Sequence, residues 1–237
     1  MTTPEAIEVK FAVAPSHTSS ALAQFAPLAV APMEDYTVHF FDLKPLALSR
    51  CGVILRVREG AKEDATFKMR GGGAKAAFET FGVGSGERKF EGDQNVGSDV
   101  KQSFSITSEP PLAKVADVLA GAVRISAMFE PDAGRFLEMP SMLGAAGEPG
   151  VYGPIEARKW KVKLKGFDGK LTVEWWKAGE VQLLEVSDKV ATGEAEAFAA
   201  ALGAHMQALG LPQLVGSKTE FALGNAAFRV LVQPGLT

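Results

Sequence analysis

Several short segments of this 237-residue chain alternate positively charged side chains with apolar ones. The clearest are AIEVKFAV (6–13), VILRVRE (53–59), ATFKMRG (65–71) and RKWKVKLK (158–165). Side chains two positions apart on a β-strand share a face, so each segment places its cations on one side of a sheet. The net charge of the chain is only −3, so cations gathered in this way predict a surface for a polyanion, most simply a chain of phosphates.

The composition is typical of a globular protein with an ample core. Hydrophobic residues make up 46% of the chain, charged residues make up 22%, and the single cysteine, Cys51, excludes an intrachain disulfide. A net charge of −3 argues against a general nucleic-acid binder, which is usually basic across a whole domain. The sequence shows no basic-then-apolar leader and no apolar run long enough for a bilayer. We therefore expect a cytoplasmic protein that binds neither nucleic acid nor membrane.

The remaining patterns predict one α+β domain over 1–237, in which antiparallel strands dominate and close, or nearly close, into a barrel. Strands are expected at 6–15, 35–43, 53–59, 65–71, 87–94 and 123–130, and in a meander over 156–166, 171–179 and 180–190. Helices are expected at 21–28, 110–122 and 193–210, with a helix and then a strand over 217–230. The Gly-rich stretch 71–86 is expected to be a loop, and 131–154 an irregular loop or insertion.

Some of these segments occur in a recognisable order along the chain. AIEVKF comes first, VHFFDL leads into VILRVRE, TFKMR and KFEGD follow, and LLEVSDK and LPQLVGSKTEF come last. This ordered set resembles the CYTH superfamily, also called triphosphate tunnel metalloenzymes, from about residue 5 to about residue 225. The resemblance implies an eight-stranded antiparallel β-tunnel with flanking helices. Its basic wall residues would hold a triphosphate, and its glutamates would bind Mg²⁺ or Mn²⁺.

Carried over by position, the resemblance implies three sets of site residues. The catalytic residues would be Glu8, Lys10 and Glu185. The metal ligands would be Glu8, Glu91 and Glu185. The phosphate ligands would be Lys10, Arg56, Arg58, Lys68, Arg70, Lys89, Arg158, Lys161 and Lys218. The chemistry agrees, because Arg and Lys are the usual phosphate ligands and hard divalent cations prefer carboxylate oxygens.

The acidic positions depart from the family pattern. Ala6 stands where the first glutamate is expected, and Glu5, one residue earlier, points to the opposite face of a regular strand. Ser187 and Lys189 likewise replace carboxylates, and Asp188 between them has the wrong parity. The loss of these carboxylates weakens the expected metal site. The sequence thus supports polyphosphate binding more firmly than it supports catalysis.

Three functions follow from these observations. The first is a metal-dependent phosphohydrolase that acts on inorganic triphosphate or a related triphosphorylated compound. The second is a non-catalytic protein of the same fold that binds polyphosphate or a phosphorylated metabolite. The third is an interaction protein whose basic strands face outward, since Lys161 and Lys163 are also typical of edge-strand protection. The sequence predicts no oligomeric state.

Overall fold

The computed structural model describes residues 4, 6–137 and 149–231, which divide into two compact units. Unit 1 contains the residues up to Tyr36, Glu91–Lys101 and Ile155–Ala226. Unit 2 contains Thr37–Phe90, Gln102–Pro154 and the residues from Ala227 onward. Each unit has its own hydrophobic core and is described by itself.

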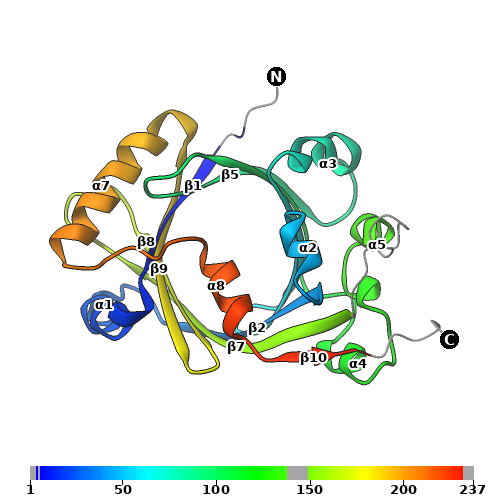
Figure 1. The fold of residues 1–237 in the computed structure, drawn as a ribbon. Helices are drawn as coiled ribbons and strands as arrows, with labels where there is room; N and C mark the ends of the chain where they lie inside the picture. The colour runs from blue at the N-terminus through cyan, green and yellow to red at the C-terminus, as the bar shows by residue number, and fades with distance from the viewer. Residues whose placement is uncertain (1–3, 5, 138–148, 232–237) are drawn as a thin grey trace. The chain divides into compact units, whose positions relative to one another are not determined.

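The strands carry most of the architecture (Figure 1). They are β1 (Ala6–Val13), β2 (Glu34–Leu43), β3 (Val53–Gly60), β4 (Asp64–Arg70), β5 (Glu87–Asn95), β6 (Lys101–Ser108), β7 (Pro149–Val162), β8 (Leu171–Ala178), β9 (Val181–Ala191) and β10 (Phe228–Val230). Their hydrogen-bonded order is β10-β7-β2-β3-β4-β6-β5-β1-β9-β8, and β8 also pairs with β7. All the strands except β10 therefore belong to a closed ring of pairs.

This pairing defines a closed, mixed β-barrel of nine strands with one strand outside it. The predicted α+β barrel with flanking helices is confirmed. The prediction of eight antiparallel strands is wrong, because β6 adds a strand and β1 runs parallel to β5. Strand number and direction depend on pairings between distant segments, which local alternation does not report.

Each unit contains its own helices. Unit 1 contains α1 (Thr18–Phe25), α7 (Ala195–Ala208) and α8 (Lys218–Asn225), with 3₁₀ turns at Pro15–His17, Ala26–Leu28 and Thr192–Glu194. Unit 2 contains α2 (Ala47–Arg50), α3 (Gly73–Phe81), α4 (Val115–Leu119) and α5 (Pro131–Leu137), with a 3₁₀ turn at Ile125–Met128. No helix in the described residues is long and apolar enough to cross a bilayer.

The core of unit 1 forms on one face of its strands. In β1 the alternate residues Ile7, Val9 and Phe11 are buried against apolar residues of α1 and α7, among them Phe25 and Leu202. A period of two in the sequence thus becomes a sheet with one apolar face, since full burial of each such side chain contributes about 1.5–3 kcal/mol. The other face of β1 carries Glu8 and Lys10, flanked by two alanines.

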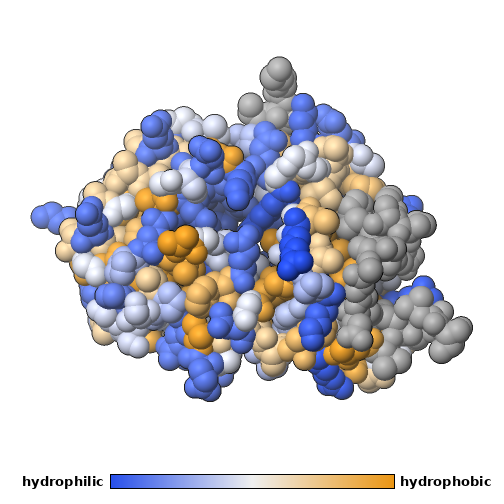
Figure 2. Space-filling model, in the orientation of Figure 1, coloured by the Kyte–Doolittle hydropathy of each residue, from blue (hydrophilic) through white to orange (hydrophobic). Residues whose placement is uncertain are grey.

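The core of unit 2 follows the same logic on β3, β4 and β6. Leu55 and Val57 of β3, Phe67 of β4 and Phe104 of β6 are buried, and they share one cluster with apolar residues of the helices. The intervening residues of these strands project from the face opposite the helices. On the surface drawn in Figure 2, hydrophilic residues are interspersed with apolar ones.

Several local predictions are confirmed. The β3–β4 hairpin, the β7–β8–β9 meander, α7, and the final helix and strand are all present. The Gly-rich stretch 71–86 is not only a loop, because α3 begins at Gly73. Its small and apolar residues at positions 74, 77, 78 and 81 have the spacing of one helix face, and they pack on the core of unit 2.

Three other predictions are corrected. The segment 123–130 forms a 3₁₀ turn and no strand, and the helix expected over 110–122 is limited to α4. Strand β6 was not predicted, although Phe104 and Ile106 alternate with polar residues in it. Of the segment 131–154, expected to be irregular, α5 and the first residues of β7 are regular, and 138–148 lie outside the described residues.

Candidate anion-binding site

The polar face of unit 2 is built by strand register. Pairing of β3 with β4 sets Arg56 opposite Thr66 and Arg58 opposite Asp64, while Lys68 lies opposite Ile54. Residues directly opposite each other in an antiparallel pair share a face. We call the side opposite the helices the basic face, and define it by Arg56, Arg58, Asp64, Thr66, Lys68 and Arg70 with Ser103, Ser105 and Thr107 of β6.

The β3–β4 hairpin presents more cations than carboxylates on the basic face. Its cations there are Arg56, Arg58, Lys68 and Arg70, all half-buried, and its one carboxylate is Asp64. The Asp64 side chain has no exposed area and accepts a hydrogen bond from Arg58 Nε at 2.9 Å and a second from Arg58 Nη2. The positive charge of this face is therefore only partly compensated within the hairpin.

Asp64 is held in its charged form by these neighbours. Burial alone would raise the pKa of its carboxyl group, but hydrogen bonds from Arg58 and the charges of Arg56, Arg58 and Lys62 lower that pKa below 3.8. Arg56 Nη2 lies 3.9 Å from Asp64 Oδ1 and donates to Thr66 Oγ1 at 3.4 Å. Asp64 thus fixes the arginines in place while it neutralises part of their charge.

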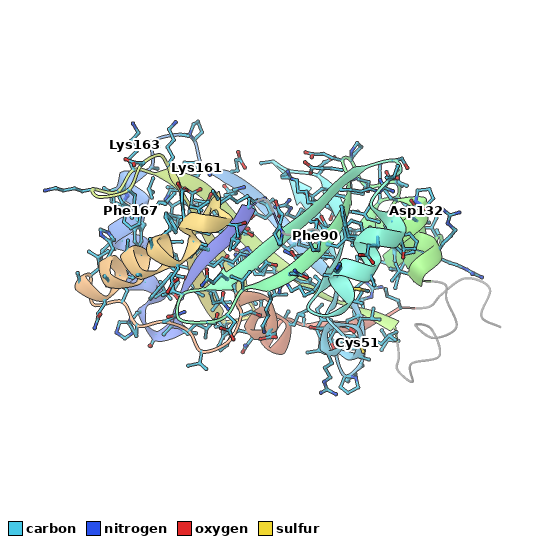
Figure 3. All side chains as sticks on the ribbon, turned by 90° about the horizontal axis from the view of Figure 1, so that it is seen from above. Cys51, Phe90, Asp132, Lys161, Lys163 and Phe167 are labelled. Carbon is cyan, nitrogen blue, oxygen red and sulfur yellow. The ribbon has the colours of Figure 1, made fainter. Side chains whose placement is uncertain are left out.

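Lys89 of β5 is the remaining phosphate ligand expected in unit 2. Its ammonium lies 2.8 Å from Glu87 Oε1, and both side chains are well exposed. The neighbouring Phe90, labelled in Figure 3, stacks on Phe78 with ring centroids 5.0 Å apart. Lys89 therefore projects away from the core, with an acidic partner on its own strand.

The polar face of unit 1 pairs its carboxylates with lysines. Lys10 Nζ lies 2.8 Å from Glu8 Oε2 and donates to Asp93 Oδ1 at 2.7 Å, and Lys189 donates to Glu91. We call this surface the balanced face, and define it by Glu8, Lys10, Glu91, Asp93, Lys159, Lys161, Glu174, Glu185, Ser187, Lys189 and Lys218.

Lys218 has the most enclosed ammonium group of this set. Its side chain is 6% exposed, it donates to Glu174 Oε2, and its Nζ lies 3.1 Å from Glu185 Oε1. The same nitrogen lies 4.2 Å from the centre of the Trp176 ring, and Tyr36 donates to the other oxygen of Glu174. Lys218, expected as a phosphate ligand, thus contacts two carboxylates and one aromatic ring.

The carboxylates expected to bind a metal do not converge. The β1–β9 register sets Glu8 opposite Lys189 and Glu185 opposite Ala12, four residues further along β1. This offset corresponds to about 13 Å along a strand, too far for both carboxylates to bind one ion. The described residues contain no group of three His, Cys, Asp or Glu side chains that could hold a metal ion. The carboxylates expected as metal ligands, as the described residues place them, therefore do not form one Mg²⁺ or Mn²⁺ site.

The positions that depart from the family pattern do not restore such a site. Ser187 lies opposite Lys10, and Asp188 lies opposite Val9, which is buried in the core of unit 1. Asp188 therefore belongs to the apolar side of β9, as its parity predicts. Glu5 lies outside the described residues.

The structure separates two cations of β7 that were expected to act together. Arg158 lies opposite Trp175, which packs on the core, and it donates to Asp35 at 2.6 and 3.1 Å. The hydrogen bond from Arg158 lowers the pKa of Asp35. Lys161 lies opposite Thr172 and donates to its hydroxyl at 2.6 Å; Figure 3 labels it beside Lys163. Arg158 and Lys161 thus occupy opposite faces of one strand.

Some polar residues of the balanced face were not predicted from the sequence. Lys159 lies directly opposite Glu174, and Asp93 lies beside Glu8 in the parallel β1–β5 pair. Alternation was a usable signal for Lys159, because it is two residues from Lys161. No local signal was available for Asp93 or Glu174, since their roles depend on which strands are neighbours.

Comparison with known proteins identifies the fold. No family model and no curated protein matches the sequence. HpAC1 from Hippeastrum, described as an adenylyl cyclase candidate with a dominant triphosphatase activity, superposes with a TM-score of 0.51 at 14% identity, over 92% of this chain and 94% of that one. An adenylate cyclase candidate from Bacillus halodurans superposes with a TM-score of 0.51 at 14% identity, over 93% of this chain and 98% of that one. The chain therefore has a CYTH-like fold, as the sequence resemblance predicted.

Proposed function

We propose that this protein binds inorganic triphosphate or a related triphosphorylated compound on the basic face of unit 2. The observation that carries the proposal is the excess of cations on the β3–β4 hairpin, where Arg56, Arg58, Lys68 and Arg70 accompany the single carboxylate of Asp64. Half-buried cations of one sign favour an anionic ligand, because they are screened less than fully exposed charges.

The arrangement suits several charged groups in a row better than one. Arg56 and Arg58 are about 7 Å apart along β3, and Arg56 and Lys68 are diagonal neighbours about 7–8 Å apart across the β3–β4 pair. Arginine offers paired donors to phosphate oxygens, and lysine offers a compact charge. The hydroxyl groups of Thr66 and Thr107, 3.1 Å apart, add neutral donors on the same face.

Hydrolysis of the bound compound is the second candidate function. It is favoured by the CYTH-like fold shared with HpAC1, which is described as having triphosphatase activity. The catalytic roles of Glu8, Lys10 and Glu185 belong to this second candidate. The three carboxylates expected as metal ligands do not converge among the described residues, so this candidate is supported by the fold and not by a metal site.

The test is a titration of the purified protein with inorganic triphosphate in isothermal calorimetry, first with EDTA and then with Mg²⁺ or Mn²⁺. The variant Arg56→Gln/Arg70→Gln spares the Arg58–Asp64 pair and should bind about 100-fold more weakly, since it removes two charged donors. Arg135→Gln is the matched control, because Arg135 is an exposed arginine of α5 bonded to Asp132. Its affinity should equal that of the wild type.

A double variant that binds as tightly as the wild type would contradict the proposal. Wild-type protein that shows no heat of binding would contradict it too, and would favour an interaction surface. Phosphate release, followed in the same samples, separates the two candidates: binding without release favours a binding protein, and release favours the hydrolase.

A further inference from the structure

Two carboxylates of the balanced face lie directly opposite each other. Glu174 of β8 and Glu185 of β9 are cross-strand partners in the antiparallel β8–β9 pair. Such partners have Cβ atoms about 5 Å apart, and like charges at this distance destabilise a sheet. The Glu185 side chain is only 9% exposed, so solvent screens it little. The pair therefore needs a cation.

Lys218 supplies that cation from a separate element. Its ammonium contacts Glu174 Oε2 and lies 3.1 Å from Glu185 Oε1, so it bridges the pair. The Trp176 ring, 4.2 Å away, adds a cation–π contact, and the Tyr36 hydroxyl satisfies Glu174 Oε1. The two carboxylates and the Trp176 ring thus stabilise the positive charge of the ammonium, and the Tyr36 hydroxyl stabilises the negative charge of Glu174.

The start of α8 holds Lys218 in this position. Ser217 accepts a hydrogen bond from the Glu220 amide at 3.2 Å, and Glu220 accepts one from the Ser217 amide at 3.3 Å, which is a capping box. A lysine in the first turn is at the unfavourable end of the helix dipole. Helix electrostatics therefore does not account for Lys218, whereas the two carboxylates do.

We infer that the Lys218 ammonium is the resident cation of the Glu174–Glu185 pair and occupies the place where these carboxylates would otherwise bind a divalent ion. Glu185, expected as a metal ligand, is then neutralised by the chain itself. Removal of the ammonium leaves two adjacent carboxylates, which is a donor set that Mg²⁺ and Mn²⁺ use, with Lys159 opposite Glu174 on the neighbouring strand.

The experiment is a titration with Mn²⁺ alone, followed by the electron paramagnetic resonance signal of the free ion. Wild-type protein should show no Mn²⁺ binding that depends on Glu185. Lys218→Met should bind Mn²⁺ at least about tenfold more tightly, and Lys218→Met/Glu185→Gln should lose that gain. Lys189→Met is the matched control, because it removes the lysine partner of a single carboxylate, that of Glu91, and should give no gain.

Wild-type Mn²⁺ binding that Glu185→Gln abolishes would overturn the inference. So would a folded Lys218→Met protein, checked by circular dichroism, whose Mn²⁺ affinity equals that of the wild type. If Lys218→Met does not fold, the comparison of wild type with Glu185→Gln still decides. No triphosphate enters the titration, so its outcome is separate from that of the proposed function.

Discussion

The basic face of unit 2 and the balanced face of unit 1 arise from the same kind of sequence, strands that alternate charged and apolar residues. On the basic face, the β3–β4 hairpin carries four cations and one carboxylate, that of Asp64, and β6 adds hydroxyl groups. On the balanced face, lysines meet carboxylates, as Lys10 does with Glu8 and Asp93. Alternation thus determines the face on which a charge lies, and the neighbouring strand determines which residue lies opposite that charge.

The largest expected effect compares a buried ion pair with an exposed one. Asp64→Asn should lower the free energy of unfolding by about 3 kcal/mol, because it leaves the Arg58 guanidinium without its buried counter-charge. Asp35→Asn removes the exposed partner of Arg158 and should cost less than about 1 kcal/mol. Urea unfolding at neutral pH measures both. Equal losses would contradict the distinction between the two pairs.

The same pair has a defined pH dependence. The folded-state pKa of Asp64 lies below its ordinary value of 3.8, so the unfolded state binds a proton more readily. The stabilisation is present above pH 3.8 and is lost as the pH falls through the lower, folded-state value. Asp64→Asn should remove this part of the acid sensitivity, which urea unfolding across the acid range measures.

On the balanced face, Lys218→Met should lower the free energy of unfolding by about 2 kcal/mol in metal-free buffer, because it leaves two opposed carboxylates. Lys218→Met/Glu185→Gln should recover part of this loss, since one of the like charges is gone. Lys189→Met, which breaks a more exposed pair with Glu91, should cost less than about 1 kcal/mol. If Lys218→Met/Glu185→Gln is less stable than Lys218→Met, repulsion between Glu174 and Glu185 is not the cause of the loss.

Salt should separate the two faces. Raising the ionic strength from about 0.1 to 1 M shortens the screening length from about 10 to 3 Å. Triphosphate affinity at the basic face should then fall about tenfold, because half-buried cations remain open to screening. The Lys218–Glu185 pair is more enclosed, so its double-mutant coupling energy should change little. Calorimetry at both salt concentrations checks the first statement, and urea unfolding checks the second.

The smallest expected effect lies at a histidine of β2. Burial lowers the pKa of His39, and the charge and hydrogen bond of Glu59 only partly oppose this. The unfolded state therefore takes up a proton first, and stability falls as the pH drops below 6.5, the ordinary value for histidine. The loss should be under about 1 kcal/mol and absent in His39→Gln. Unfolding curves at acidic and at mildly alkaline pH measure this loss of stability. If His39→Gln loses as much stability on acidification as the wild type does, a group other than His39 causes the loss.

The sequence was sufficient to predict those features that depend on neighbouring residues along the chain. Alternation located β1, β3, β4 and the β7–β9 meander, and parity separated Asp188 from the polar face of β9. It was insufficient where the partner of a strand decides the outcome. The parallel pairing of β1 with β5, which brings Asp93 to Lys10, joins segments far apart in the chain.

The candidate site shows the same division. The cations of the β3–β4 hairpin could be predicted as a group, because one hairpin carries them all. Arg158 and Lys161 could not be separated by residue type alone, and only the β7–β8 register sets them on opposite faces. The contact of Lys218 with Glu174 and Glu185 required the placement of α8 against two strands, which no motif encodes.

The capping box at Ser217 has a consequence for how the Glu174–Glu185 pair is controlled. A cation attached to the backbone has the same occupancy at every concentration of free ions, and chelators cannot withdraw it. Its reach is limited by the length of the Lys218 side chain, which starts in the first turn of α8. The position of one side chain on α8, and not the supply of free ions, therefore sets the charge balance of this pair.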